Sequence, residues 1–281
     1  MKNGIQIILL ILFLTVPLSG FPQNKIETSK AQIKSGSGGS GHHKGGESRT
    51  YSANEGNDYA SGCLSADGII HILWLVTYYA LIGDYEYEKH LHSNLSGYPF
   101  YNGKSGNYES VNANPSPTRY LRIDLENSFL YSNERLNGNH ARLRIRPLQY
   151  FFIQGDYFGL KEYDKLNTNY ARLDLFNFNL CYDRIRFENF DLGWSLGVNY
   201  IGNEVNKAGF SYGLNAGLFL AKHLSFYSSA KWSEINELPV FEFEIQCKYH
   251  ISRFFVSLGF EHLLIGTPNY DFISSGAGIY L

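Results

Sequence analysis

The chain has 281 residues and a formal net charge of −2 at pH 7, so its charge gives no reason to expect nucleic acid as a partner. It contains 22 Tyr, 20 Phe and 28 Gly. Aromatic residues suit pleated strands, and glycine suits tight turns and crowded interiors. The composition therefore favours an all-β protein.

Residues 1–20 are predicted to be a secretory signal peptide. Lys2 supplies a positive charge, and residues 5–16 (IQIILLILFLTV) form an apolar run that is too short to span a bilayer as a helix. Pro17 and Ser19 follow the run, as is typical near a signal-peptidase site. We therefore expect an exported mature chain that begins near residue 21.

Residues 21–62 are predicted to be a disordered Gly/Ser-rich linker, which we expect in the periplasm. Its centre, residues 35–48 (SGSGGSGHHKGGES), is too polar to bury the apolar surface that ordering requires. His42 and His43 have no third ligand in fixed geometry beside them, so a solvated linker is favoured over a metal site.

Residues 63–116 are predicted to hold a short apolar segment and an irregular region. The apolar run, residues 69–82 (IIHILWLVTYYALI), has the composition of a helix but is too short to cross a membrane. It could lie on the membrane surface, dock against the following domain or pack elsewhere. In the irregular remainder, residues 95–101 form one candidate strand.

From residue 117 to residue 281 the chain alternates between apolar and polar residues, which predicts half-buried strands. In residues 188–200, for example, Phe190, Leu192 and Trp194 alternate with Asp191 and Gly193. Ten such segments occur, and together they predict an antiparallel transmembrane β-barrel of about ten strands (8–12). The segments are 118–131, 138–146, 148–158, 168–182, 187–201, 208–220, 224–234, 240–250, 254–265 and 270–281.

Alternation alone does not say which face lies inside, because a soluble lipocalin-like barrel would bury the apolar set. Three features favour apolar residues on the outside. The polar face combines Gly, Ser and Asn with opposite charges, and aromatic residues such as Tyr131 and Tyr249 stand at strand ends. The last candidate strand also runs to the final residue, Leu281, which would close the barrel without a tail. Separately, short turns alternate with longer links, as in bacterial membrane barrels.

The final residues resemble the C-terminal β-signal read by the bacterial outer-membrane assembly machinery. Ser274, Gly276, Ile279 and Leu281 occupy its defining positions, although many such proteins end in Phe. The chain thereby resembles the small outer-membrane barrels of Bacteroidota. The resemblance implies the outer membrane of a Gram-negative bacterium, with membrane lipid and the barrel assembly machinery as partners, and it names no activity.

The polar face predicts a network of charged side chains in the lumen. One interpretation is a salt-bridged plug, and the other is a narrow polar conduit or small-ligand site. His140, Asp191 and Lys231 fall on the same polar face of the alternating pattern as the members of this network. Its predicted members are Arg122, Asp124, Glu126, Arg142, Arg144, Glu242, Glu244 and Lys248.

No residue pattern indicates a catalytic site, a cofactor or a metal. The pair His92-Ser93 precedes the barrel and has no acidic residue in register, and His262 stands alone near a strand end. The three cysteines, Cys63, Cys181 and Cys247, are not spaced as a disulfide framework. We therefore expect a non-enzymatic protein with an envelope-structural, assembly or surface-interaction role. The alternatives are a lipid A- or phospholipid-modifying enzyme and a narrow porin or transporter.

Overall fold

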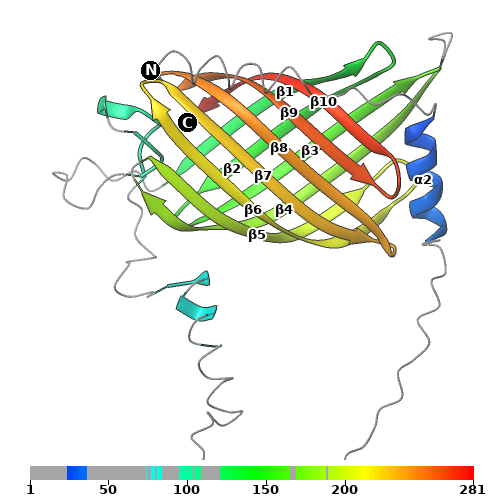
Figure 1. Cartoon of the computed structure of the whole chain (residues 1–281), viewed down its shortest axis with the longest axis horizontal. Coiled ribbons are helices and arrows are strands. Elements are labelled where there is room, and N and C mark those ends of the chain that lie inside the picture. The colour runs from blue at the N-terminus through cyan, green and yellow to red at the C-terminus, as the bar shows by residue number, and fades with distance from the viewer. Residues whose placement is uncertain are drawn as a thin grey trace, which may run out of the picture.

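The computed structural model describes residues 24–36, 74, 77–79, 81–83, 95–103, 105–108, 121–164, 169–187 and 189–281. Within them, ten antiparallel strands form a closed barrel (Figure 1), as predicted. Each strand pairs with its neighbours in sequence, and β1 closes the wall by pairing with β10. The strands are β1 (Arg122–Asn133), β2 (Leu136–Arg146), β3 (Phe151–Tyr163), β4 (Tyr170–Phe187), β5 (Phe190–Ile201), β6 (Lys207–Ala221), β7 (Leu224–Ile235), β8 (Leu238–Ile251), β9 (Phe254–Ile265) and β10 (Asn269–Tyr280).

The apolar face of the wall points outward. In β1 the side chains of Leu125 and Phe129 are 40% and 51% exposed, whereas Glu126 and Ser128 between them are 8% and 1% exposed. A soluble barrel would show the opposite pattern, so the lipocalin-like alternative is wrong. An apolar exterior around a polar interior is the arrangement of a transmembrane β-barrel.

Most connections are shorter than predicted, and six of the ten strands are longer than their predicted segments. Only two residues join β1 to β2 and β7 to β8, where the sequence predicted longer polar links. In the second of these turns Asn236 and Glu237 both have positive φ, at 53° and 67°, which is the backbone of a tight hairpin turn. The longest connection, between Tyr163 and Tyr170, has six residues. The predicted contrast between short turns and long links is therefore weak.

The two ends of the barrel differ in what they carry. We call the end with the β1–β2, β3–β4, β5–β6, β7–β8 and β9–β10 connections the loop rim. The opposite end, with Leu121 and Leu281, is the terminal rim. Backbone hydrogen bonds between Ile123 and Leu281 complete the wall there.

A helix occupies the loop rim where the sequence predicted a disordered linker. Helix α2 (Lys25–Ser35), drawn in blue in Figure 1, lies across this end of the barrel. The prediction of disorder is wrong for these residues because strand residues far along the chain supply the apolar surface that the helix lacks by itself. The rest of residues 21–62, and the signal peptide predicted in residues 1–20, lie outside the described residues.

The apolar segment docks against the outside of the wall near the terminal rim. The backbone oxygens of Tyr79, Leu81 and Ile82 accept hydrogen bonds from Arg184, Trp194 and Tyr182, which belong to β4 and β5. Of the three positions left open by the sequence, docking against the barrel is the one observed for these residues. None of the described helices is long and apolar enough to cross a membrane.

The predicted strand at residues 95–101 is wrong. Leu95 makes one isolated β-bridge to Tyr108, and Tyr101–Gly103 form a single 3-10 turn, η1. These residues lie at the terminal rim, where the backbone oxygen of Ser96 accepts a hydrogen bond from Arg122 Nη1 at 3.3 Å. A bridge of one residue pair has no alternating pattern to detect.

Candidate functional site

All eight predicted network residues point into the lumen and are buried. Their exposed fractions range from 1% for Arg122 to 8% for Glu126 and Arg144. His140, Asp191 and Lys231, which share their parity, are buried as well. The period-two pattern thus placed the polar face correctly, while any function of this network stays a prediction.

Arg142 is the centre of the network on the loop-rim side. Its Nε lies 2.6 Å from Asp156 Oδ1, and its Nη2 lies 2.6 Å from Glu244 Oε1. Lys231 Nζ holds the second oxygen of Asp156 at 2.6 Å. Glu242 accepts hydrogen bonds from the amide nitrogens of two asparagines instead of from a cation. Charges from four strands are therefore bound to one another across the lumen.

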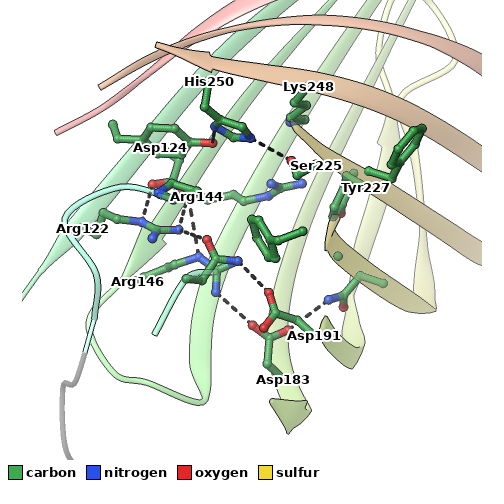
Figure 2. A pocket seen from close by; sticks show the side chains of 17 residues that line it. Arg122, Asp124, Arg144, Arg146, Asp183, Asp191, Ser225, Tyr227, Lys248 and His250 are labelled. Carbon is green, nitrogen blue, oxygen red and sulfur yellow. Dashed lines mark hydrogen bonds and ion pairs between the residues drawn. The ribbon is translucent and has the colours of Figure 1, made fainter. Parts of the chain in front are cut away.

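A second group of ion pairs fills the terminal-rim side (Figure 2). Arg122 Nε lies 2.8 Å from Asp124 Oδ1, and Lys248 Nζ lies 2.6 Å from an oxygen of Glu126. Arg144 donates to the neutral Gln154 at 2.8 Å and stacks on Tyr227, with 4.2 Å between the guanidinium carbon and the ring centroid. Opposite charges and aromatic faces thus compensate most of the charges buried here.

Residues 105–108 contribute two of the side chains that close this end. Asn107 accepts a hydrogen bond from Arg122 at 2.9 Å and donates one to Asp191 at 2.7 Å. The Tyr108 hydroxyl donates to Asp183, and burial together with the Asp183 carboxylate raises the pKa of Tyr108 well above its ordinary value. The chain ahead of the barrel is thereby joined to the lumen network.

Little space remains among these side chains. The cavity in Figure 2, at the terminal rim, has a volume of about 40 Å³. A second lumenal cavity, beside Arg142 and Glu261, has about 10 Å³. One water needs roughly 10–15 Å³ by this measure, so these cavities hold a few waters at most. Both rims are occupied by other parts of the chain, so the described lumen is closed.

The loop rim differs from the rest of the lumen in having an apolar inner wall. Helix α2 fills this mouth with Ile26 and Ile33, which lie seven residues apart on one helix face and are fully buried. Their burial is worth several kcal/mol, at about 1.5–3 kcal/mol for each buried aliphatic side chain. The wall residues that pack with them are Leu130, Leu136, Phe158, Leu160, Leu173, Leu175, Ile201, Val205, Ile235, Leu238, Val240, Leu263, Ile265, Tyr270 and Phe272.

Polar contacts fix the orientation of the helix in this mouth. The Ser29 hydroxyl donates to the backbone oxygen of Ile265 at 2.9 Å and lies 2.8 Å from the Tyr270 hydroxyl. Lys34 lies 3.2 Å from Glu204, and this hydrogen bond lowers the pKa of Glu204. At the end of the helix, Gly36 takes a left-handed conformation and its N–H donates to Gln32 O, as a C-terminal cap does. The helix is bound at both ends and along one face.

A serine and a histidine also lie together in the lumen. Ser225 Oγ is 2.8 Å from His250 Nε2 (Figure 2), and the other ring nitrogen of His250 is 3.4 Å from the Tyr280 hydroxyl. The imidazole is surrounded by the rings of Phe100, Phe255 and Tyr280. A nucleophile beside a base is present here, but the third position holds a phenol in place of a carboxylate.

The other sequence candidates are scattered. His262 lies on the outer wall, with Nδ1 2.6 Å from Asp271, and His92, Ser93 and Cys63 lie outside the described residues. Among the described residues, Cys181 and Cys247 are free. Of the assembly-signal residues, Ser274 is buried, and Gly276 lies on the β10 segment that pairs with β1.

Sequence reasoning missed several residues of the site. Asp156, Glu261, Arg146 and Asp183 are buried and charged, and the period-two pattern of their strands could have identified them. The period-two pattern gave no indication of the role of Glu162 or of helix α2. Their roles depend on contacts between segments about 136 residues apart.

Comparison with known proteins finds 27 matching chains of solved structure, among them three outer-membrane proteins of low similarity. An outer membrane channel from Pseudomonas putida F1 is 8% identical, with 60% of this chain and 100% of that chain covered and a TM-score of 0.34. Neisserial surface protein A is 12% identical (57% and 97% covered, TM-score 0.29), and Ail of Yersinia pestis is 10% identical (57% and 96% covered, TM-score 0.27). No family model and no curated protein matches. The assignment as a membrane barrel therefore depends on the polarity of the wall.

Proposed function

We propose that this protein is a closed outer-membrane β-barrel of a Gram-negative bacterium with a structural or surface-interaction role in the envelope. One observation carries the proposal: the lumen is filled by ion pairs and occupied at both rims, by α2 at one end and by residues 95–103 and 105–108 at the other. A barrel with a lipid-facing wall and a packed interior exposes its two rims to the aqueous phases and does not conduct ions.

The sequence supports the cellular location. The predicted signal peptide directs the chain out of the cytoplasm, and Ser274, Gly276, Ile279 and Leu281 match the signal for insertion by the assembly machinery. In outer-membrane barrels the short turns face the periplasm and the longer loops face outward. This orientation would put the loop rim and α2 at the cell surface, in place of the periplasmic position predicted for the N-terminal linker.

Planar bilayers test the proposal against the narrow-porin alternative. The mature chain, residues 21–281, should insert into the bilayer without producing single-channel conductance steps. The reason is that the small lumenal cavities do not join into a continuous water path. A variant that lacks residues 21–36 tests how far α2 is responsible for closure. Stable single-channel steps from the intact mature chain would contradict the proposal.

The Ser225–His250 pair favours one second candidate, a hydrolase that acts on membrane lipid. Its hydrogen bond of 2.8 Å is the geometry of an activated nucleophile. Against it, the pair faces the packed lumen, whereas the substrate would lie outside the wall. Incubation of the mature protein with phospholipid vesicles separates the two functions. Release of fatty acid that Ser225→Ala abolishes would establish the hydrolase, and no release is expected.

A further inference from the structure

Two buried carboxylates lie directly opposite each other on the inner wall. Glu244 of β8 and Glu261 of β9 are register partners, and they are 6% and 1% exposed. Like charges at directly opposed positions of an antiparallel pair destabilise the sheet. A positive charge between them would reverse the sign of that interaction.

The cations nearby satisfy only half of this pair. Arg142 Nη2 holds Glu244 Oε1 at 2.6 Å, and His140 Nδ1 lies 2.8 Å from Glu261 Oε2. Glu244 Oε2 and Glu261 Oε1 have no hydrogen-bond partner among the described residues. A buried, unpartnered carboxylate oxygen costs more than a neutral group would. Two strong electron donors are therefore free in the same place.

A cavity adjoins these two carboxylates. Its charged lining consists of Glu242, Glu244 and Glu261 together with Arg142 and Lys231, and its volume is about 10 Å³. That is space for one ion or one water, and too little for an organic ligand. The chemical class of an occupant is thereby restricted to something of atomic size.

The charges of the lumen are balanced in one half and unbalanced in the other. On the terminal-rim side four buried carboxylates face four buried Arg and Lys side chains: Asp124, Glu126, Asp183 and Asp191 with Arg122, Arg144, Arg146 and Lys248. On the loop-rim side four carboxylates face only two such cations: Asp156, Glu242, Glu244 and Glu261 with Arg142 and Lys231. A metal ion that replaced the proton on His140 Nδ1 would leave the imidazole neutral, and this half would then lack two positive charges, which is the charge of one divalent cation.

From these four observations we infer that His140, Glu244 and Glu261 bind a divalent transition-metal ion inside the barrel. One ligand atom from each residue lies within 4.8 Å of the others. An imidazole with two carboxylates is a ligand set that suits Zn²⁺, with a water as the fourth ligand. The other imidazole nitrogen, Nε2, lies 3.1 Å from Asp156 Oδ1, so a carboxylate would orient the ring as it does at other His–metal sites.

The position of the three ligands defines what the ion would do. His140 lies on β2, whereas Glu244 and Glu261 lie on β8 and β9, and β1 and β10 separate β2 from β9 around the wall. An ion at this point would therefore tie together parts of the wall that share no ladder. Its role would be a structural link across the lumen, and the inference holds whether or not the barrel conducts.

The test uses the mature full-length chain, refolded in detergent with one equivalent of Zn²⁺ or with EDTA and then freed of unbound metal. Folded barrel is recognised by its heat-modifiable migration on gels, and zinc is counted by mass spectrometry. We expect about one Zn²⁺ per wild-type chain and a higher unfolding temperature than in EDTA. Glu261→Gln and His140→Gln should each weaken zinc binding by at least about tenfold and abolish the stabilisation.

Asp191→Asn is the matched control. Asp191 is also a buried lumenal carboxylate with one unpartnered oxygen, but it lies in the balanced half. This variant should bind zinc like the wild type. Zinc-free wild-type protein after refolding with the metal, or equal zinc in the Glu261→Gln and control variants, would overturn the inference.

A second measurement keeps the test decisive if the ligand variants do not fold. Co²⁺ in a site of four N and O ligands gives visible d–d absorption, so wild-type protein refolded with one equivalent of Co²⁺ should be coloured. It should lose this absorption when Zn²⁺ displaces the ion. Absence of the band from folded wild-type protein would equally overturn the inference.

Discussion

The backbone N–H of Ile26 donates to the carboxylate of Glu162 at 2.8 Å, and the N–H of Lys25 donates to its other oxygen at 3.1 Å. The residue before the helix, Asn24, makes no capping hydrogen bond with its own side chain. A strand residue of the barrel therefore caps the helix and also places a negative charge at its positive end.

Glu162→Ala should loosen helix α2 without opening the wall. It removes two hydrogen bonds to a charged acceptor, each worth about 1.5–3 kcal/mol at most. We expect trypsin to cleave after Lys30 and Lys34 much faster than in the wild type, while heat-modifiable migration persists. Glu134→Ala, an exposed glutamate of the β1–β2 turn, is the control and should leave cleavage unchanged. Equal cleavage in both variants would show that Glu162 does not hold the helix.

Ile33→Ala should weaken the docking of α2 by about 2–5 kcal/mol, because it leaves a cavity in the apolar mouth. Amide hydrogen exchange in residues 25–35 is the direct measurement, and exchange should accelerate across the whole helix. Ala31→Ser, on the exposed face of the same helix, should change it little. If the two variants exchange alike, burial of Ile33 does not secure the helix.

Arg142→Ala should be among the most destabilising substitutions in the barrel. It leaves Asp156 and Glu244 buried without a cation on one oxygen, and breaking buried ion pairs costs about 3–5 kcal/mol. Arg172→Ala is the comparison, because its pair with Asp174 lies on the outer wall with the guanidinium half-exposed, and such pairs contribute about 0–1 kcal/mol. Urea unfolding from lipid vesicles measures both. Similar losses would mean that the lumen network is solvated.

Gly276→Val should impair closure of the barrel. A Cβ at this position would lie 2.7 Å from the backbone oxygen of Asn127 and would overlap Ser128 Oγ. We expect the folded, heat-modifiable form to be lost or sharply reduced even when the chain refolds in pure detergent, without any assembly machinery. Ala277→Val, on the outer face next to it, should fold normally. Normal refolding of Gly276→Val, with failure only in cells, would assign this glycine to the assembly signal alone.

Labelling of single cysteines, introduced into a chain in which Cys63, Cys181 and Cys247 are all replaced by Ser, measures the orientation in the membrane. With the loop rim outside, Lys34→Cys should react with a membrane-impermeant maleimide on intact cells, and Arg253→Cys in the β8–β9 turn should react only after permeabilisation. Both side chains are exposed at their own rim. The reverse result would place α2 in the periplasm.

The wall of this protein was predictable because a strand repeats every two residues. Once Phe190, Leu192 and Trp194 are assigned to the outer face, every other residue of the same strand is assigned to the inner or outer face by alternation. The partners within the lumen were not predictable. Arg142 meets Glu244 across 102 residues of chain, and that encounter depends on strand register and barrel closure, which no local pattern encodes.

Helix α2 escaped prediction for a related reason. Its two buried isoleucines, Ile26 and Ile33, are too few for a helical period to stand out against a polar background. The segment folds because the mouth of the barrel supplies the missing apolar surface. Residues 95–103 and 105–108 likewise contact side chains that follow them in the sequence, such as Arg122 and Asp191.

The order of strands around the wall has a consequence for how the barrel forms. Nine of its ten ladders join strands that are neighbours in sequence, so these hairpins can form before the rest of the chain is in place. The β1–β10 ladder, with eight register pairs against 13 between β3 and β4, joins residues about 150 positions apart. Until the β1–β10 ladder forms, every intermediate sheet has two unpaired edge strands that can pair with strands of other chains. The open sheet is therefore the folding intermediate in which wrong strand pairing is most favoured.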